Sequence, residues 1–487
     1  MHDRSTSLSY AVRLPVLAKY LGQLALMLAM LTTVLLGVAL LFQDFTIAFR
    51  YFLVVAVLII GWQLSRKIPE PRQIQANEAL TIIALAFVIS PLLMTFPLMS
   101  SGLTFSNALF EAVSAVTTTG LSTTTDLADR SASFLFARAW LQWYGGLGIV
   151  VLSVALVMEH HVTSRSLSEP LGGDTLATTT RIHSRRMLIV YGVMTLIGMV
   201  GVWLISGDGL MAVTHVLAAV STGGFSMFEN SLGGLPDWSS RFAIISLCLC
   251  GAVPLPLYHV LCSKNWRTGL RDVELLALLS AVLLLASILT LTLHYSNGIQ
   301  FRESVLHALL LGISTQTTAG FSSLDIGTLD NGTRFCMILS MFIGGGVGST
   351  AGGIKLIRLL ILLKLIQVLL QRSTMPPQAV QYPKLGGRVL EDAEIQRVLL
   401  LILLFIGVVA GSWLAFLGYG YEPLDALFEV VSATATVGLS TGITSGDMPL
   451  FLKLLLSLDM LLGRLEIIAL LVLMYARNWA GKRKEVE

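Results

Sequence analysis

Residues 108–122 read ALFEAVSAVTTTGLS, and residues 426–440 read ALFEVVSATATVGLS. The end of this stretch occurs twice more, as STGGFS at 221–226 and as TTAGFS at 317–322. All four copies fit the pattern Thr-x-Gly-[Leu/Phe]-Ser. Because regular self-similarity is the signature of a repeat architecture, the chain is predicted to fold as four equivalent units.

The composition places these units in a membrane. Of the 487 residues, 55% are hydrophobic and only 13% are charged. Many apolar runs reach about 20 residues, the length that a helix needs to cross a bilayer. Lipid offers the backbone no hydrogen bonds, so these runs are expected to be helices. The predicted full spans lie near 16–42, 46–64, 75–97, 135–158, 186–206, 241–262, 273–295, 332–370, 396–418 and 450–475.

Shorter apolar segments precede the four repeated tails, and they are too short to cross a bilayer. They lie near 104–116, 209–220, 302–316 and 422–434. Each is expected to be a half-spanning helix followed by an irregular loop, which is tolerated at that depth only where it lines a cavity or is buried in protein. Small-residue packing motifs are the alternative interpretation, but these recur at helical spacing within a span.

The predicted fold is therefore an all-α integral membrane protein. Four tandem M1–P–M2 repeats (a span, a re-entrant pore helix with its filter loop, and a second span) surround a pseudo-fourfold pore. Two extra transmembrane helices precede them. The expected units are 1–69 for the two N-terminal helices, 70–165, 180–265 and 268–372 for pore repeats 1 to 3, with a broken second helix in the third, and 390–487 for pore repeat 4.

The positions of the basic residues orient the chain. With the N-terminus in the cytoplasm, most of the 32 Lys and Arg residues fall on the cytoplasmic side, as the positive-inside rule requires. Both termini are therefore predicted to be cytoplasmic, and the four short helices to enter from outside. The cytoplasmic basic residues include Arg66, Lys67, Arg72, Arg181, Arg185, Arg186, Lys264, Arg267, Arg271, Lys355, Arg358, Lys384, Arg388, Lys482, Arg483 and Lys484.

The repeated tail has the chemistry of a potassium filter. A potassium ion gives up its hydration water only where other oxygens replace it, and rings of backbone carbonyls do so. Glycine permits the unusual dihedrals of such a loop, and the threonine two residues earlier can add a hydroxyl oxygen or brace the loop. Each short helix would point its negative end at the cation. Potassium is the only metal expected, with no covalently bound cofactor. The candidate filter residues are Thr118, Thr119, Gly120, Thr222, Gly223, Gly224, Thr318, Ala319, Gly320, Thr436, Val437 and Gly438.

Glu111, His215, Leu311 and Glu429 occupy one shared position in the four short helices. The two glutamates could attract cations or brace the loops, or they could be hydrogen-bonded structural carboxylates. For His215, and for His307 in the third helix, a structural role is favoured over a ligand role.

A glycine-rich stretch interrupts the span at 332–370. Residues 344–355 read GGGVGSTAGGIK. Each glycine destabilises a helix by about 1 kcal/mol relative to alanine, so the stretch is expected to unwind just inside the third filter as a plug or gate. It lacks the Gly-Lys-[Ser/Thr] ending and preceding strand of a phosphate-binding loop. The candidate gate residues are Gly344, Gly345, Gly346, Gly348, Ser349, Thr350, Gly352, Gly353, Lys355 and Arg464.

Arg464 lies deep within the last predicted span. A buried arginine in a membrane is a functional candidate by default. Its charge would repel potassium below the filter and would be attracted to the carbonyls of the unwound stretch. A structural pair with Asp459 or Glu466 is the alternative.

These motifs resemble the Trk/Ktr/HKT family of potassium transporters, most closely the transmembrane subunit of the bacterial Trk system, over about residues 70–487. The matches are the four filters, QWYGGLG at 142–148, the glycine stretch at 344–355 and GRLE at 463–466. Glycine at all four filter positions resembles the potassium-selective members. One departure is GAVPLP at 251–256, whose two prolines are expected to bend the span.

The resemblance implies potassium uptake across a bacterial inner membrane, with gating at the glycine stretch and Arg464. It also implies a homodimer with one pore per subunit, and a TrkA-like cytoplasmic nucleotide-binding regulatory subunit as partner. The lipid bilayer is the other expected partner, and no nucleic acid is expected.

Two other classes of protein remain as alternatives. A secondary transporter of a small solute coupled to a cation gradient would show inverted repeats, whereas these repeats are parallel. An intramembrane enzyme would need a catalytic motif, and MEHH at 158–161 is not the His-Glu-x-x-His of a zinc protease. The chain is therefore not expected to be an enzyme.

Overall fold

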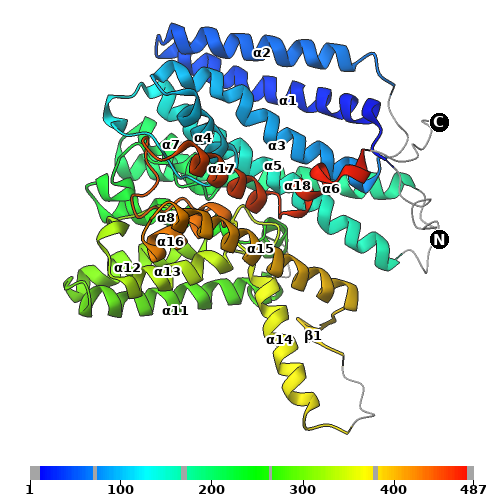
Figure 1. The fold of residues 1–487 in the computed structure, drawn as a ribbon, viewed down its shortest axis with the longest axis vertical. Coiled ribbons are helices and arrows are strands. Elements are labelled where there is room, and N and C mark those ends of the chain that lie inside the picture. Colours follow the sequence, from blue (N-terminus) through cyan, green and yellow to red (C-terminus); the bar gives the residue numbers. More distant parts are fainter. Residues whose placement is uncertain (1–10, 70–73, 166–172, 263–265, 377–381, 480–487) are drawn as a thin grey trace.

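The computed structural model describes residues 11–69, 74–165, 173–262, 266–376 and 382–479, and within them all side chains except those of 149–183. Most helices lie side by side in one bundle, and α14 projects from it (Figure 1). The residues MEHH at 158–161 lie outside the described side chains, and Arg72, Lys264, Lys482, Arg483 and Lys484 lie outside the described residues.

The elements follow the apolar pattern of the sequence closely. The helices of the first half are α1 (Leu14–Leu41), α2 (Phe45–Ser65), α3 (Ala76–Leu98), α4 (Phe105–Val116), α5 (Ala132–Arg165), α6 (Gly173–Ser206), α7 (Gly209–Val220), α8 (Trp238–Ala252), α9 (Leu255–Leu261) and α10 (Trp266–Leu270). The second half contains α11 (Val273–Tyr295), α12 (Phe301–Gln316), α13 (Asn331–Ile343), α14 (Leu356–Arg372), α15 (Asp392–Gly418), α16 (Pro423–Thr434), α17 (Leu450–Arg464) and α18 (Ile468–Met474).

Short elements complete the described chain. A two-residue hairpin pairs β1 (Lys384–Leu385) antiparallel with β2 (Arg388–Val389) between α14 and α15. The 3-10 turns are η2 (Met99–Ser101), η3 (Leu127–Asp129), η4 (Ser231–Gly234), η5 (Ile326–Thr328) and η6 (Ala476–Asn478).

Six helices in the described part of the chain are long and apolar enough to cross a membrane, and the pair α8 and α9 makes a seventh candidate. The axes of that pair meet at 96°, so the predicted bend is confirmed. Pro254 precedes α9 and Pro256 lies in its first turn, where proline is tolerated but cannot continue a preceding helix.

The span predicted at 332–370 consists of two helices, α13 and α14, and residues 344–355 between them are not helical. The predicted unwinding is therefore present. The span predicted at 450–475 is not one continuous helix, because α17 ends at Arg464 and α18 begins at Ile468. Glu466 and Ile467 adopt φ angles of 52° and 63°. For Ile467, which is β-branched, this backbone conformation is an outlier that the surrounding contacts must hold in place.

Capping side chains fix where the short helices begin. The Asp208 carboxylate accepts from the backbone amides of Leu210 and Met211 at the start of α7, at 2.9 and 3.1 Å. Thr104 caps α4 and Glu422 caps α16 in the same way. Each cap satisfies amide groups that the first turn leaves unpaired.

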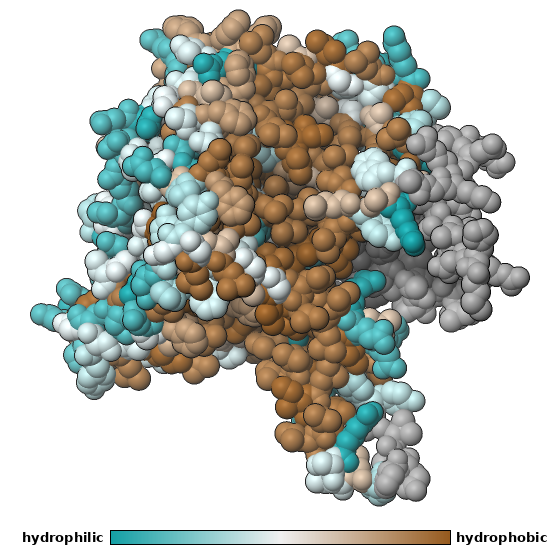
Figure 2. All heavy atoms as spheres, viewed as in Figure 1, coloured by the Kyte–Doolittle hydropathy of each residue, from teal (hydrophilic) through white to brown (hydrophobic). Residues whose placement is uncertain are grey.

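Apolar side chains cover a broad face of the bundle, as the brown band across Figure 2 shows. Among the described residues, large apolar side chains such as Leu204, Leu403 and Leu196 are exposed. The interior in turn holds many polar groups, including fully buried Glu111 and Glu429. An apolar outside with polar groups buried in the bundle is typical of a protein that lies in lipid.

Candidate functional site: a ring of four loops

The four short helices, α4, α7, α12 and α16, end in the same hydrogen-bonded motif. In α4, the amide of Thr118 bonds the Ala115 carbonyl at 3.0 Å and the amide of Thr119 bonds the Ser114 carbonyl at 2.9 Å. This pair of bonds is the Schellman motif, which satisfies carbonyls at a helix end. The equivalent amides make the same two bonds in the other copies, at Thr222 and Gly223, Thr318 and Ala319, and Thr436 and Val437.

The residue at the left-handed position of this motif is usually glycine, but here it is threonine each time. Thr118, Thr222, Thr318 and Thr436 have φ angles of 55°, 50°, 54° and 51°. A non-glycine residue in this region costs of order 1–3 kcal/mol and persists only where its surroundings determine it. Four such residues at equivalent positions make these loops the candidate functional site.

The glycine two residues after each of these threonines also has a positive φ. Gly120, Gly224, Gly320 and Gly438 have φ angles of 93°, 78°, 75° and 95°. A left-handed threonine followed two residues later by a left-handed glycine gives all four loops the same backbone shape.

These glycines join the loops into a ring. A Cβ atom on Gly120 would lie 2.2 Å from the Gly223 carbonyl oxygen of the second loop. Equivalent close approaches join Gly224 to the Ala319 oxygen, Gly320 to the Val437 oxygen and Gly438 to the Thr119 oxygen, at 2.2, 1.9 and 2.1 Å. The four loops therefore contact one another in chain order and close on themselves. Residues 118–120, 222–224, 318–320 and 436–438 are called the loop ring below.

Glu111 and Glu429 hold the loops that follow their own helices. The Glu429 carboxylate accepts from the Ser440 hydroxyl at 2.5 Å, from the Thr441 amide at 2.8 Å and from the Thr444 hydroxyl at 2.7 Å. Glu111 accepts from the amide of Thr123 at 2.9 Å and from the hydroxyl of Ser122. Of the roles left open by the sequence, loop bracing is the one that these contacts support.

The two histidines in the short helices are also hydrogen-bonded within the protein. The His215 ring contacts the Met211 carbonyl and the Ser226 hydroxyl at 2.9 and 3.0 Å. The His307 ring contacts the Ser323 hydroxyl at 2.8 Å. The described residues contain no cluster of His, Cys, Asp and Glu that could hold a metal ion.

Residues 344–355, called the glycine loop below, lie against two members of the loop ring and against Ala435, which directly precedes a third. The Gly352 amide donates to the Thr318 hydroxyl oxygen at 2.6 Å, and the Gly353 amide donates to the Ala435 carbonyl at 3.1 Å. The Thr350 hydroxyl lies 3.3 Å from that of Thr222.

Side chains from three other elements hold the glycine loop in place. Gln316, at the end of α12, donates to the Gly344 carbonyl at 2.7 Å. Glu274, in the first turn of α11, accepts from the Val347 amide at 2.8 Å. The predicted attraction between Arg464 and the loop carbonyls is present, since Arg464 Nη1 donates to the Thr350 carbonyl at 2.8 Å.

The alternative pairing of Arg464 with Asp459 or Glu466 is not found. The Asp459 carboxylate accepts from the Ser412 hydroxyl at 2.9 Å, and Glu466 pairs with Arg358 of α14. Within the described part of the chain, Arg464 Nε and Nη2 have no hydrogen-bond partner although the side chain is buried.

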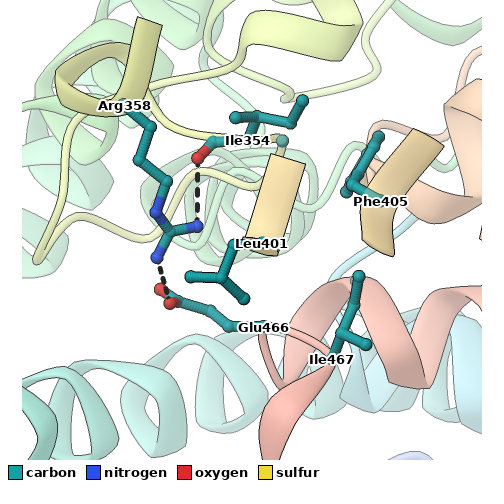
Figure 3. A pocket seen from close by; sticks show the side chains of 8 residues that line it. Ile354, Arg358, Leu401, Phe405, Glu466 and Ile467 are labelled. Carbon is teal, nitrogen blue, oxygen red and sulfur yellow. Dashed lines mark hydrogen bonds and ion pairs between the residues drawn. The ribbon is translucent and has the colours of Figure 1, made fainter. Parts of the chain in front are cut away.

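A small cavity lies beside residues 465–467, the break between α17 and α18. Figure 3 shows Arg358 pointing toward Glu466, with Leu401 and Phe405 of α15 and Ile467 around the cavity. Arg358 also donates to the Ile354 carbonyl at 3.0 Å. The break therefore contacts the glycine loop through Arg464 and the start of α14 through Glu466.

Arg138 and Gln142 of α5 contact the loops, and the sequence did not predict these contacts. Arg138 bonds Glu111 at 3.2 Å and the Ser226 carbonyl at 3.3 Å, and its guanidinium lies 3.9 Å from the ring centre of Phe225. Gln142 bonds the second loop. A polar pair one helical turn apart in an apolar span is the signal that could have pointed to them.

The fold and the site together define a multi-pass helical membrane protein built around a ring of loop backbone. The family described as TrkH, cation transport protein, matches residues 45–480. The chain belongs to this family, which is one of transport proteins and not of enzymes.

Several relatives are similar over most of their length. The Trk system potassium uptake protein TrkI of Halomonas elongata is 30% identical and covers 88% of each chain. The Trk system potassium uptake protein TrkH of Escherichia coli is 29% identical, over 88% of this chain and 91% of its own. The crystal structure of the potassium transporter TrkH from Vibrio parahaemolyticus matches with a TM-score of 0.85 over 96% of this chain and all of its own, at 24% identity.

Proposed function

We propose that this chain takes up potassium through a pore at the centre of the loop ring. The observation that carries the proposal is the cyclic contact of the four loops, from Gly120 to the second loop and finally from Gly438 back to the first. Backbone oxygens brought together in a closed ring can replace the hydration shell of a monovalent cation. The names of the related Trk system proteins support potassium as that cation.

Two further features favour a cation at this ring. The short helices α4, α7, α12 and α16 end at the loops, so the negative ends of their dipoles point there. The hydroxyl oxygens of Thr118 and Thr436 are buried and have no partner among the described residues. A buried polar atom without a partner is costly, and a bound cation would satisfy both hydroxyls. The filter residues are then the twelve predicted from the repeated tails.

The glycine loop is the gate in this proposal. It contacts the second, third and fourth loops through Thr350, Gly352 and Gly353, so it lies where ions leaving the ring on that side would pass. Arg464 adds a positive charge that opposes a cation there and holds the loop through Thr350.

The finer architecture follows from the same reasoning. Four units of span, re-entrant helix with loop, and span, over 70–165, 180–265, 268–372 and 390–487, surround one pore, and the two helices in 1–69 lie outside it. Both termini are in the cytoplasm of a bacterial cell, under the inner membrane.

The chain works as a homodimer with a TrkA-like nucleotide-binding regulatory subunit. The naming of the relatives as parts of a Trk system supports a partner. Helix α14 offers a place for contact, because it projects from the bundle with Leu363, Ile366, Leu369 and Leu370 exposed (Figure 1). Apart from potassium in the pore, the proposal involves no metal and no cofactor.

A flux assay tests the filter. The purified protein in liposomes is expected to conduct potassium and rubidium in preference to sodium. Gly120→Ser and Gly438→Ser each place a side chain about 2 Å from a ring carbonyl, so we expect potassium over sodium selectivity to fall by about tenfold, equivalent to about 1.4 kcal/mol.

Gly411→Ser in α15 is the matched control, because a Cβ there meets nothing within 4 Å. Unchanged selectivity in both filter variants contradicts the assignment. Failure of the wild-type protein to conduct potassium contradicts the proposed function itself.

A further inference from the structure

The second loop of the ring differs from the other three at the residue before its filter glycine. That residue is Thr119, Ala319 or Val437 in the other loops, whereas the second loop has Gly223. A Cβ on Gly223 would lie 2.5–2.8 Å from the terminal atoms of the Gln142 side chain. Gln142 of α5 therefore occupies the space that a side chain fills in the other loops.

The second loop also lacks a hydroxyl that two other loops use. In the first and fourth loops, the amides of Gly120 and Gly438 donate to the hydroxyls of Ser114 and Ser432, both at 3.0 Å. The equivalent residue before the second loop is Ala218. Compared with the first and fourth loops, the second loop thus lacks both a side chain within the ring and a hydroxyl acceptor behind it.

Gln142 supplies contacts at this place from outside the loop. Its Nε2 donates to the Gly223 carbonyl at 2.5 Å, and its Oε1 accepts from the Phe225 amide at 3.1 Å. These two bonds reach the residues on either side of Gly224. Gln142 is fully buried, so both ends of its amide need partners, and this fixes its orientation.

We infer that Gln142 is a positioning residue that sets cation selectivity in the second quarter of the ring. It holds the peptide groups around Gly224, as the Ser114 and Ser432 hydroxyls hold the amides of Gly120 and Gly438 in the first and fourth loops. The Gly223 carbonyl that it bonds is also the one that contacts Gly120 of the first loop, so its loss alters the spacing between two quarters. This inference rests on the proposed function and adds a selectivity determinant outside the repeated tails.

The test measures the ratio of rubidium to sodium flux in liposomes together with the melting temperature. Gln142→Ala removes both bonds and is expected to lower the ratio by about tenfold, equivalent to about 1.4 kcal/mol, because the peptide groups on either side of Gly224 lose the side chain that holds them. Gln142→Glu keeps the size and the acceptor for Phe225 but loses the donor to Gly223, so an intermediate ratio is expected. Gln300→Ala is the control, because Gln300 is exposed at the start of α12.

Rescue distinguishes positioning from a general effect on folding. Gly223→Ala alone collides with Gln142, whereas Gly223→Ala combined with Gln142→Ala gives the second loop the residue found in the third. Ala218→Ser combined with Gln142→Ala restores the hydroxyl found behind the first and fourth loops. We expect each double variant to recover at least half of the lost selectivity.

A folded Gln142→Ala protein with the wild-type flux ratio overturns the inference, and so does an unchanged ratio in Gln142→Glu if the alanine variant does not fold. Wild-type protein that conducts neither ion selectively overturns the proposed function and the inference together. A selective wild type with insensitive Gln142 variants overturns the inference alone.

Discussion

Buried carboxylates determine the shape of the loops at the residue scale. No arginine in the described part of the chain pairs with Glu429, and hydroxyl and amide donors from Ser440, Thr441 and Thr444 converge on it instead. A carboxylate that accepts several short hydrogen bonds contributes more than neutral bonds of the same number. The loop that follows α16 therefore depends on this one side chain.

Glu429→Ala is expected to destabilise the protein strongly. It leaves several buried donors unpaired, at roughly 1–3 kcal/mol for each, so we expect a clear fall in melting temperature and the loss of selective flux. Glu429→Gln should cost less, because it keeps the shape and one acceptor. Glu303→Ala, at an exposed position of the short helix α12, is the control, and equal melting temperatures for Glu429→Ala and this control would contradict the bracing role.

At the scale of elements, the break between α17 and α18 holds the glycine loop. Arg464 contacts Thr350 within that loop, and Glu466 pairs with Arg358, in the first turn of α14 that follows it. Ile467 remains at a positive φ within the break. Two contacts from one short, strained segment thus fix the loop and its exit helix relative to the ring.

Arg464→Ala is expected to raise basal potassium flux several-fold, because it removes both the bond to Thr350 and the positive charge near the ring. Arg464→Lys keeps the charge, so its basal potassium flux should lie between that of the wild type and that of Arg464→Ala. Flux is measured in liposomes without added partner, with Arg477→Ala as a control at an exposed arginine of η6. If flux in Arg464→Ala falls or stays at the wild-type level, the gating role of this residue is lost.

At the scale of the whole molecule, basic residues near the starts of α5, α13 and α17 bond elements that are distant in the chain. Arg138 of α5 bonds the Ser226 carbonyl, which follows the second loop, and Arg334 of α13 pairs with Asp425 of α16. Lys453 of α17 bonds Asn107 of α4 at 2.7 Å. The bond from Lys453 to Asn107 joins the C-terminal part of the chain to the first short helix, as the approach of Gly438 to the Thr119 carbonyl does within the loop ring.

The predicted orientation of the chain is tested by cysteine accessibility. In a variant with the four native cysteines replaced by serine, Ser296→Cys and Ser373→Cys each add one exposed thiol. A membrane-impermeant maleimide applied to intact cells should label the thiol at 296, which follows α11, and reach the one at 373, which follows α14, only after lysis. Labelling of position 373 in intact cells would reverse the topology.

Much of the helical structure could be predicted because it depends on local composition. The span expected at 273–295 is α11 (Val273–Tyr295), and the short helix expected at 302–316 is α12 (Phe301–Gln316). The unwound glycine loop and the bend at the prolines were also predicted, since glycine and proline act within one helical turn. The break after Arg464 was not, because the side-chain contacts that hold it come from distant residues.

The sequence by itself determined that the chain lies in a membrane, where most of its apolar helices lie, and which four tails are equivalent, because apolar length and repeated residues are local properties. Only the tertiary structure decided the order in which the loops meet and the side chains that brace them. Gln142 and Gly223 are 81 residues apart in the chain, and Arg464 and Thr350 are 114 apart. Such pairs are brought together by helix packing, in which each contact depends on all the others, so no local pattern indicates them.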